Sequence, residues 1–173
     1  MCKHAENTKQ IIDHIMVDVY PLLNNKIADA LTYLETAKAT PPDLHVLINL
    51  INEVKNELTS LITYEQKLVF PSVLKVFHSE SVNTPMPNLA DLLQLTRSKE
   101  HKLMHHIKKI ALMLQKPLWD AKSQQLLVAA FVTAFVEEKA AWYKMIDDRL
   151  NSCSCFKKNY FELSKLQAKK ITS

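Results

Sequence analysis

The chain has 173 residues, of which 47% are hydrophobic and 23% charged, and these proportions are ordinary for one globular domain with one core. It contains no glycine, which argues against β-hairpins and excludes Gly-rich phosphate loops and dinucleotide-binding folds. The net charge is +4, and residues 156–173 supply all of it with five lysines against one glutamate, so the rest of the chain lacks the basic face of a nucleic-acid-binding protein.

The sequence also bears on the compartment. No apolar run has the length of a membrane-spanning helix, and the polar first ten residues lack the apolar core of a signal peptide. Three cysteines are too few, and odd in number, for a disulfide scaffold, so a reducing environment is favoured. These features predict a cytoplasmic protein without a membrane partner.

The first predicted helix runs from about Asn7 to Lys38 and ends before the helix-breaking sequence Thr40-Pro41-Pro42-Asp43. Its apolar stripe comprises Met16, Tyr20, Leu23, Ile27, Ala30 and Leu34. Tyr20 is therefore expected to face the core, where its hydroxyl needs a hydrogen-bond partner.

The second predicted helix has the clearest pattern, with one interior residue every three or four positions. The stripe is Leu44, Leu47, Ile51, Val54, Leu58, Leu61, Glu65 and Leu68. A glutamate in the interior costs several kcal/mol unless it is paired, protonated or bound to a cation. Glu65 is therefore the first candidate functional residue. The alternative is that Glu65 lies at the rim of the stripe, with its carboxylate in water.

The third predicted helix runs from about Asn88 to Gln115 and carries His101 and His105 four residues apart on one face. Metal sites in helical bundles use histidines and carboxylates that project inward from several helices. Glu65 and His101 are thus candidate metal ligands from two helices, with His105 as a third.

The fourth predicted helix runs from about Trp119 to Leu150, and Lys139 lies one turn after the apolar Phe135, so we expect it to point inward as well. Short connections between the four helices favour antiparallel neighbours. The predicted fold is an all-α, up-down-up-down four-helix bundle over residues 1–152. Residues 153–173 form a basic amphipathic tail, predicted to be a short helix.

The segment NELTSLITYEQKLVFP at residues 56–71 resembles the second-helix motif of hemerythrin-like (HHE cation-binding) proteins, roughly E-L-x-x-H-x-x-x-E-E-x-x-L-F-P. Residues 11–15 resemble the opening of the first helix of that family, and Glu100-His101 resembles the E-H of its third helix. The resemblance covers about Ile11 to Met145. It is closest to the di-iron proteins implicated in the repair of iron–sulfur clusters damaged by oxidative or nitrosative stress.

This resemblance implies seven iron-ligand positions, of which Glu65 and His101 keep a residue that binds iron. The other positions fall on Tyr20, on Thr40 or Pro41, and on Leu61, Phe135 and Lys139. The paired N-terminal cysteines of the family are reduced to Cys2. The resemblance therefore implies a degenerate metal site in a hemerythrin-like bundle.

The replacements are consistent with a polar cluster in the place of the metal. In this hypothesis Lys139 forms a buried ion pair with Glu65, and Tyr20 and His101 complete a hydrogen-bonded cluster, so that an ammonium replaces the cation. The alternative is that Lys139 extends to solvent while Glu65 is protonated or hydrated.

The cysteines leave a second metal hypothesis. An up-down-up-down bundle brings the start of the chain and the end of the fourth helix to the same end. Cys2, His4, Cys153 and Cys155 would then offer three thiolates and an imidazole for zinc. The C-x-C spacing is unusual for a zinc site.

Two functions remain open at this stage. The first is a hemerythrin-like protein that has lost di-iron binding, holds no cofactor and acts through protein contacts, in a stress response. The alternative is a residual protein for iron or another divalent metal, with a role in iron–sulfur cluster repair or in oxygen or nitric oxide chemistry. No nucleophile triad or paired carboxylates indicate an enzyme. A cytokine-like or purely structural bundle also fits the periodicity. The sequence names no protein partner, and a homodimer stays open.

Overall fold

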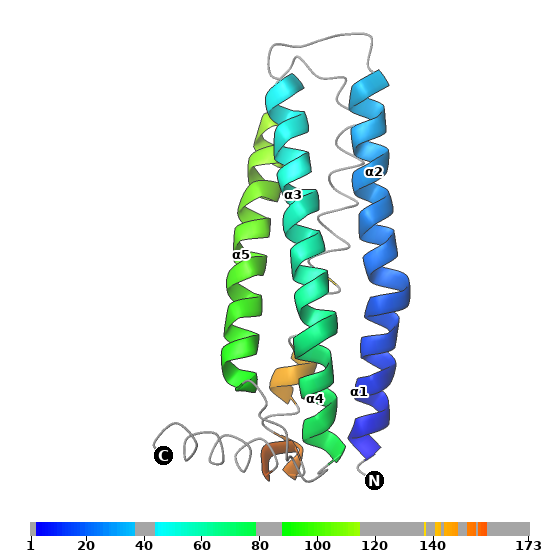
Figure 1. Ribbon diagram of the computed structural model, residues 1–173, viewed down its shortest axis with the longest axis vertical. Helices are drawn as coiled ribbons and strands as arrows, with labels where there is room; N and C mark the ends of the chain where they lie inside the picture. Colours follow the sequence, from blue (N-terminus) through cyan, green and yellow to red (C-terminus); the bar gives the residue numbers. More distant parts are fainter. Residues whose placement is uncertain are drawn as a thin grey trace.

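The computed structural model describes residues 3–36, 44–78, 88–114, 137, 141–142, 144–148, 152–154 and 156–158. Within these residues every regular element is a helix and none is a strand (Figure 1). The predicted all-α class is therefore confirmed for the described part of the chain. The predicted fourth helix and the tail fall largely outside it.

The first long helix comprises α1 (Lys3–His14), the π-helical turn η1 (Ile15–Val19) and α2 (Tyr20–Thr36). The backbone stays helical at both junctions, with φ −59° and ψ −46° at His14 and φ −65° and ψ −43° at Tyr20. The Tyr20 N–H donates to the carbonyl of Ile15, five residues earlier, which is the hydrogen bond of a π-turn.

The second long helix repeats this construction. It comprises α3 (Leu44–Tyr64), the π-helical turn η2 (Glu65–Val69) and α4 (Phe70–His78). The Phe70 N–H donates to the carbonyl of Glu65, again five residues earlier.

The sequence explains why both turns form where they do. η1 is followed by Tyr20-Pro21 and η2 by Phe70-Pro71. A proline inside a helix lacks the N–H for the ordinary hydrogen bond, and its ring clashes with the carbonyl four residues earlier. A wider turn before the proline relieves that contact. We attribute both π-turns to these prolines.

The third long helix, α5 (Leu89–Leu114), ends within one residue of its predicted bounds at each end. Asn88 caps it, since its side-chain Oδ1 accepts the Ala90 N–H at 3.0 Å and its carbonyl accepts the Leu92 N–H at 3.0 Å. No described helix is both long and apolar enough to cross a bilayer.

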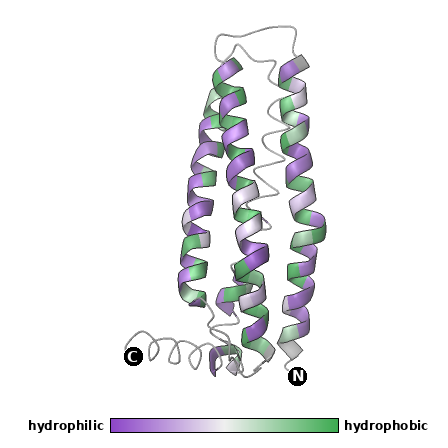
Figure 2. Ribbon diagram, viewed as in Figure 1, coloured by the Kyte–Doolittle hydropathy of each residue, from purple (hydrophilic) through white to green (hydrophobic). Residues whose placement is uncertain are grey.

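The three long helices lie alongside one another, with α3 between α2 and α5 in the view of Figure 1. Hydrophobic and hydrophilic residues alternate along each helix, as amphipathic helices require (Figure 2). The inward faces form one hydrophobic core, which also includes Trp142, Met145, Ile146, Cys153 and Phe156. Phe156 packs on Phe77 with ring centroids 4.8 Å apart, so this part of the predicted tail joins the core.

The prediction that Leu68 is buried is wrong. Leu68 is 39% exposed, whereas Val69 and Phe70 are buried. The physical reason is η2, because a π-turn takes more residues per turn than an α-helix and so moves the buried face along the sequence by one position. In the first helix Tyr20 and Leu23 are buried as predicted, along with Ile27 and Leu34, while Met16 and Ala30 are only partly buried.

Candidate interior polar site

Glu65 and Tyr20 form a hydrogen-bonded pair in the core. The Tyr20 hydroxyl donates to Oε2 of Glu65, and the exposed fractions of the two residues are 2% and 0%. The prediction that Tyr20 faces the core is confirmed. The alternative position for Glu65, at the rim with its carboxylate in water, is wrong.

The two π-turns position this pair. Glu65 is the first residue of η2, and Tyr20 is the first residue after η1. The hydrogen bond of η1 is donated by the Tyr20 N–H, and that of η2 is accepted by the Glu65 carbonyl. π-turns inside α-helices occur frequently at functional sites because they change the direction in which a side chain projects.

Apolar side chains surround the pair. The Tyr20 ring stacks on Phe70, with centroids 6.4 Å apart and an interplanar angle of 16°. Phe70 in turn meets the edge of Trp142, at 5.1 Å and 87°. Leu61, one turn before Glu65, is also buried. A carboxylate in such surroundings depends on its hydrogen bonds, because burying a charge without partners is costly.

The third helix contributes a different residue from the one predicted. His101 is exposed, and so is His105, so the expectation that His101 points into the core is wrong. The buried stripe of α5 is Leu89, Leu92, Leu93, Thr96, Glu100, Leu103, Ile107 and Ile110. Glu100, rather than its neighbour His101, is the interior residue. Sequence reasoning missed Glu100, although its spacing of four residues from Thr96 and three from Leu103 is the pattern that could have identified it.

Glu100 lies at about the height of Thr59 along the helices. α3 and α5 run antiparallel, since Lys99 Nζ lies 3.3 Å from Ser60 Oγ and Lys102 Nζ lies 2.8 Å from Glu57 Oε1. This register places Glu100 about two helical turns, roughly 9 Å along the axis, from the height of Glu65. Among the described residues the interior thus contains two glutamates, of which only Glu65 was predicted.

The remaining predicted positions divide between buried and undescribed residues. Leu61 is buried and fills space where the resemblance implies an imidazole. Thr40, Pro41, Phe135 and Lys139 lie outside the described residues, so the predicted Lys139–Glu65 ion pair stays a prediction.

The proposed zinc ligands are only partly described. Cys2, Cys155 and the side chain of His4 lie outside the described residues. Cys153 is buried, and its sulfur accepts the Phe156 N–H at 3.4 Å. Cys153 is therefore placed as the cap of the helical residues that follow it.

The donor atoms near Glu65 are oxygens. Glu65 and Tyr20 supply a carboxylate and a phenol oxygen, and no described histidine side chain is buried, whereas a di-iron centre uses histidines together with carboxylates. Within the described parts of the chain, no three His, Cys, Asp or Glu side chains are grouped so as to hold a metal ion. The described residues thus do not fit the di-iron centre that the resemblance implies. No protein-family model, curated protein or solved structure matches the chain.

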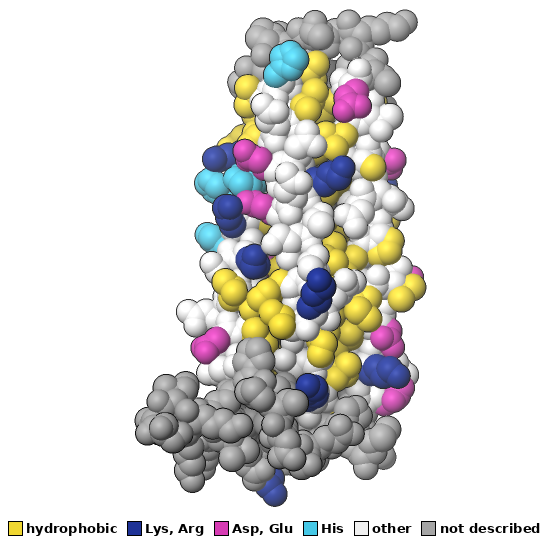
Figure 3. Space-filling view, viewed as in Figure 1, with side chains coloured by type: hydrophobic (Ala, Val, Ile, Leu, Met, Phe, Trp, Pro, Cys, Tyr) yellow, Lys and Arg dark blue, Asp and Glu magenta, His cyan; other side chains and the backbone are white. Residues whose placement is uncertain are grey.

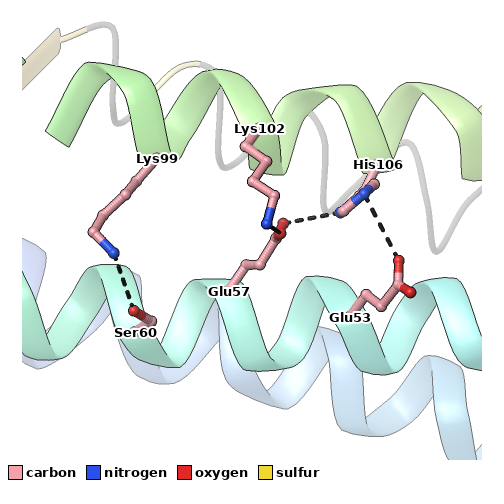
Figure 4. A network of polar contacts seen from close by, with 6 residues as sticks. All are labelled: Glu53, Glu57, Ser60, Lys99, Lys102 and His106. Carbon is pink, nitrogen blue, oxygen red and sulfur yellow. Dashed lines mark hydrogen bonds and ion pairs between the residues drawn. The ribbon is translucent and has the colours of Figure 1, made fainter. Parts of the chain in front are cut away.

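A second polar cluster joins α3 to α5 at the surface (Figure 4). The two ring nitrogens of His106 face carboxylates, with Nδ1 2.9 Å from Glu57 and Nε2 3.7 Å from Glu53. Glu57 also pairs with Lys102, and this hydrogen bond and charge raise the pKa of Lys102. Figure 3 shows histidine, acidic and basic side chains gathered on the α5 side of the molecule.

Our sequence reasoning missed this cluster, although its spacing was visible. Glu53 and Glu57 are four residues apart on α3, and Lys102 and His106 are four apart on α5, so each pair shares one helix face. The sequence predicts that these helices run antiparallel, but it does not specify how far one is shifted along the other. That axial alignment brings the two pairs together. The cluster links the surface faces of α3 and α5.

Proposed function

We propose that this chain is a hemerythrin-like four-helix bundle that has lost di-iron binding and acts through contacts with another protein in a stress response. The observation that carries the proposal is the hydrogen bond from Tyr20 to Glu65. Glu65 is the carboxylate that the second-helix motif assigns to iron, and here a protein hydroxyl occupies one of its oxygens.

The surroundings of the pair support the loss of iron. The resemblance assigns imidazoles to the positions of Leu61 and Tyr20, and neither side chain is one. His101, the histidine that the motif retains, is exposed. The described interior around Glu65 therefore offers oxygen donors alone, and a di-iron centre uses histidines together with carboxylates.

The outer surface supports the second half of the proposal. The polar pair is enclosed in the core, so the surface is the part of the protein that meets other molecules. Several large apolar side chains are exposed there, among them Val17 at 68%, Leu112 at 64% and Val46 at 51%. Side chains of this kind supply contact area in protein interfaces.

Iron content tests the loss of the metal site. The full-length protein, expressed in iron-replete medium and purified without a His tag, is expected to contain only trace iron and to have no visible absorption band. Stoichiometric iron with a visible spectrum would overturn the proposal.

Capture of binding partners from the native cell, compared between the wild type and a Val17→Asp, Leu112→Asp double variant, tests the protein contacts. Equal capture by both would exclude these two positions from the interface.

The buried glutamates favour one alternative, a residual site for iron or another divalent metal with a role in iron–sulfur cluster repair or in oxygen or nitric oxide chemistry. Glu65 and Glu100 are both buried, and carboxylates in a core are stabilised by a cation. Titration with ferrous iron separates the two functions. A residual site predicts saturable binding that Glu65→Gln abolishes and that Glu57→Gln, at the surface, leaves unchanged.

A further inference from the structure

A line of three aromatic rings in the core ends at a carboxylate. Trp142 meets the edge of Phe70, Phe70 stacks on Tyr20, and the Tyr20 hydroxyl donates to Glu65. The three aromatic residues and Glu65 are each no more than 2% exposed. An oxidisable indole and an oxidisable phenol are thus separated by a single ring, and a proton acceptor adjoins the phenol.

This geometry meets the chemical requirement for one-electron oxidation of tyrosine. A phenol that loses an electron becomes a strong acid, so the oxidation proceeds readily only when a base takes the proton at the same time. Glu65 Oε2 is already the acceptor of the Tyr20 hydroxyl hydrogen bond. The proton therefore needs to move only along an existing hydrogen bond, without solvent entering the core.

We propose that Tyr20 is a redox-active tyrosine that reduces one-electron radical oxidants, with Glu65 as the acceptor of its proton. The substrate class is a one-electron radical oxidant. The oxidant takes one electron and leaves as its anion, Tyr20 becomes a neutral phenoxyl radical, and the hydroxyl proton goes to Glu65. A thiolate then gives one electron to the Tyr20 radical and leaves as a thiyl radical, and the proton returns from Glu65 to the Tyr20 oxygen.

Trp142 has a different part in this scheme. Its indole N–H is buried and has no hydrogen-bond acceptor among the described residues. An oxidised Trp142 therefore has no described base that takes its proton, whereas Tyr20 has Glu65. An electron passes from Tyr20 through the contact with Phe70 to Trp142, and the unpaired electron comes to rest on Tyr20.

Burial gives the radical its lifetime. Exposed tyrosyl radicals are lost when two of them couple, and Tyr20 is 2% exposed, so its ring cannot meet another phenoxyl ring. The scheme needs neither a metal nor a protein partner. It therefore goes beyond the proposed function, and the experiments that test the two are independent.

Pulse radiolysis of the metal-free, full-length protein tests the scheme. Azide radicals oxidise tryptophan, after which absorbance of the indolyl radical is expected to decay as that of the phenoxyl radical rises, at a rate independent of protein concentration. Tyr20→Phe is expected to abolish this intramolecular phase. Tyr64→Phe, at a partly buried tyrosine beside Lys99, is the matched control and is expected to retain it.

Glu65→Gln tests the proton acceptor, because an amide oxygen accepts the hydroxyl hydrogen bond but not the proton. The phase is expected to slow by about tenfold or more, which corresponds to about 1.4 kcal/mol in activation free energy. Circular dichroism checks that the variant folds; should it fail to fold, a slower phase of the wild type in D₂O tests the same proton transfer. An unchanged rate in folded Glu65→Gln, an absent D₂O effect, or a phase that survives Tyr20→Phe would overturn the proposal.

Discussion

The hydroxyl of Tyr20 reaches the carboxylate of Glu65 across 45 positions of sequence, and each residue adjoins a π-turn of its own helix. The two turns are built alike, since each is followed by an aromatic residue and a proline. The two π-turns thus lie in different helices, and the residues of the one side-chain hydrogen bond lie at these turns. That convergence marks the pair as the centre of the interior site.

A double-mutant cycle measures the strength of this hydrogen bond. Tyr20→Phe removes the donor from a buried carboxylate and is expected to lower the free energy of unfolding by about 1.5–3 kcal/mol. Combined with Glu65→Gln, the pair is expected to have a coupling energy between about 0.5 and 3 kcal/mol in urea unfolding.

The pair of His14 and Asp18 is the control for this cycle, since its atoms are 2.8 Å apart but its side chains are 52% and 63% exposed. The combination of His14→Gln and Asp18→Asn is expected to show a coupling of no more than about 0.5 kcal/mol. If the buried pair couples no more strongly than this exposed pair, the hydrogen bond is not a structural determinant.

The interior position of Tyr20 and Glu65 was predictable because three- and four-residue spacing reports which face of a helix is buried. Motif similarity alone was less reliable. It selected His101, whereas the spacing of buried residues on α5 selects Glu100. The exposure of Leu68 was not predictable from spacing, because a π-turn changes the period and leaves only the following proline as a clue. The start of α5 was predictable because Asn88 caps it, whereas the first helix begins at Lys3, four residues before the predicted Asn7.

Deletion variants test the attribution of η1 to Pro21. Deletion of the exposed Val17 removes the extra residue of the π-turn, so Pro21 then lies in a regular α-helix. The free energy of unfolding is expected to fall by about 3 kcal/mol, because the proline ring then clashes with a backbone carbonyl. The double change, deletion of Val17 with Pro21→Ala, is therefore expected to recover most of that loss in urea unfolding.

The matched control is deletion of the exposed Asn25 from α2. It rotates one half of the helix by about 100° relative to the other and turns core residues toward water. Pro21→Ala is expected to give no recovery in that background. Equal recovery in both backgrounds would contradict the link between η1 and Pro21.

Glu57 is expected to matter more than Glu53 for the docking of α5 on α3. The Glu57 side chain is 19% exposed and contacts Lys102 and His106, whereas that of Glu53 is 57% exposed with its oxygen 3.7 Å from His106. Glu57→Gln is expected to cost about 1 kcal/mol and Glu53→Gln less than about 0.5 kcal/mol in thermal unfolding. High salt should reduce the difference between the stability losses of the two variants, because it screens charges at the surface. Equal losses would show that the contacts of Glu57 add nothing.

Alkaline pH should weaken the same contact between α3 and α5. Burial, and then the charge of Asp91, raise the pKa of Tyr64 above its ordinary 10.0, and the Glu57 hydrogen bond raises the pKa of Lys102 above its ordinary 10.5. Above about pH 10 the folded protein therefore holds more protons on these groups than the unfolded chain, so stability falls as pH rises. Below that pH both contributions are fully present.

Tyr64→Phe removes the phenol part of this pH dependence. We expect the difference in unfolding free energy between the wild type and this variant to be constant from about pH 7 to 9.5. Above about pH 10 the wild type should lose more stability than the variant, because only the wild type carries the Tyr64 phenol, whose folded-state pKa is raised. Urea unfolding at a series of pH values measures both curves. Parallel curves up to about pH 11 would mean that Tyr64 ionises as readily in the folded protein as in the unfolded chain, and that its burial against α5 has no energetic consequence.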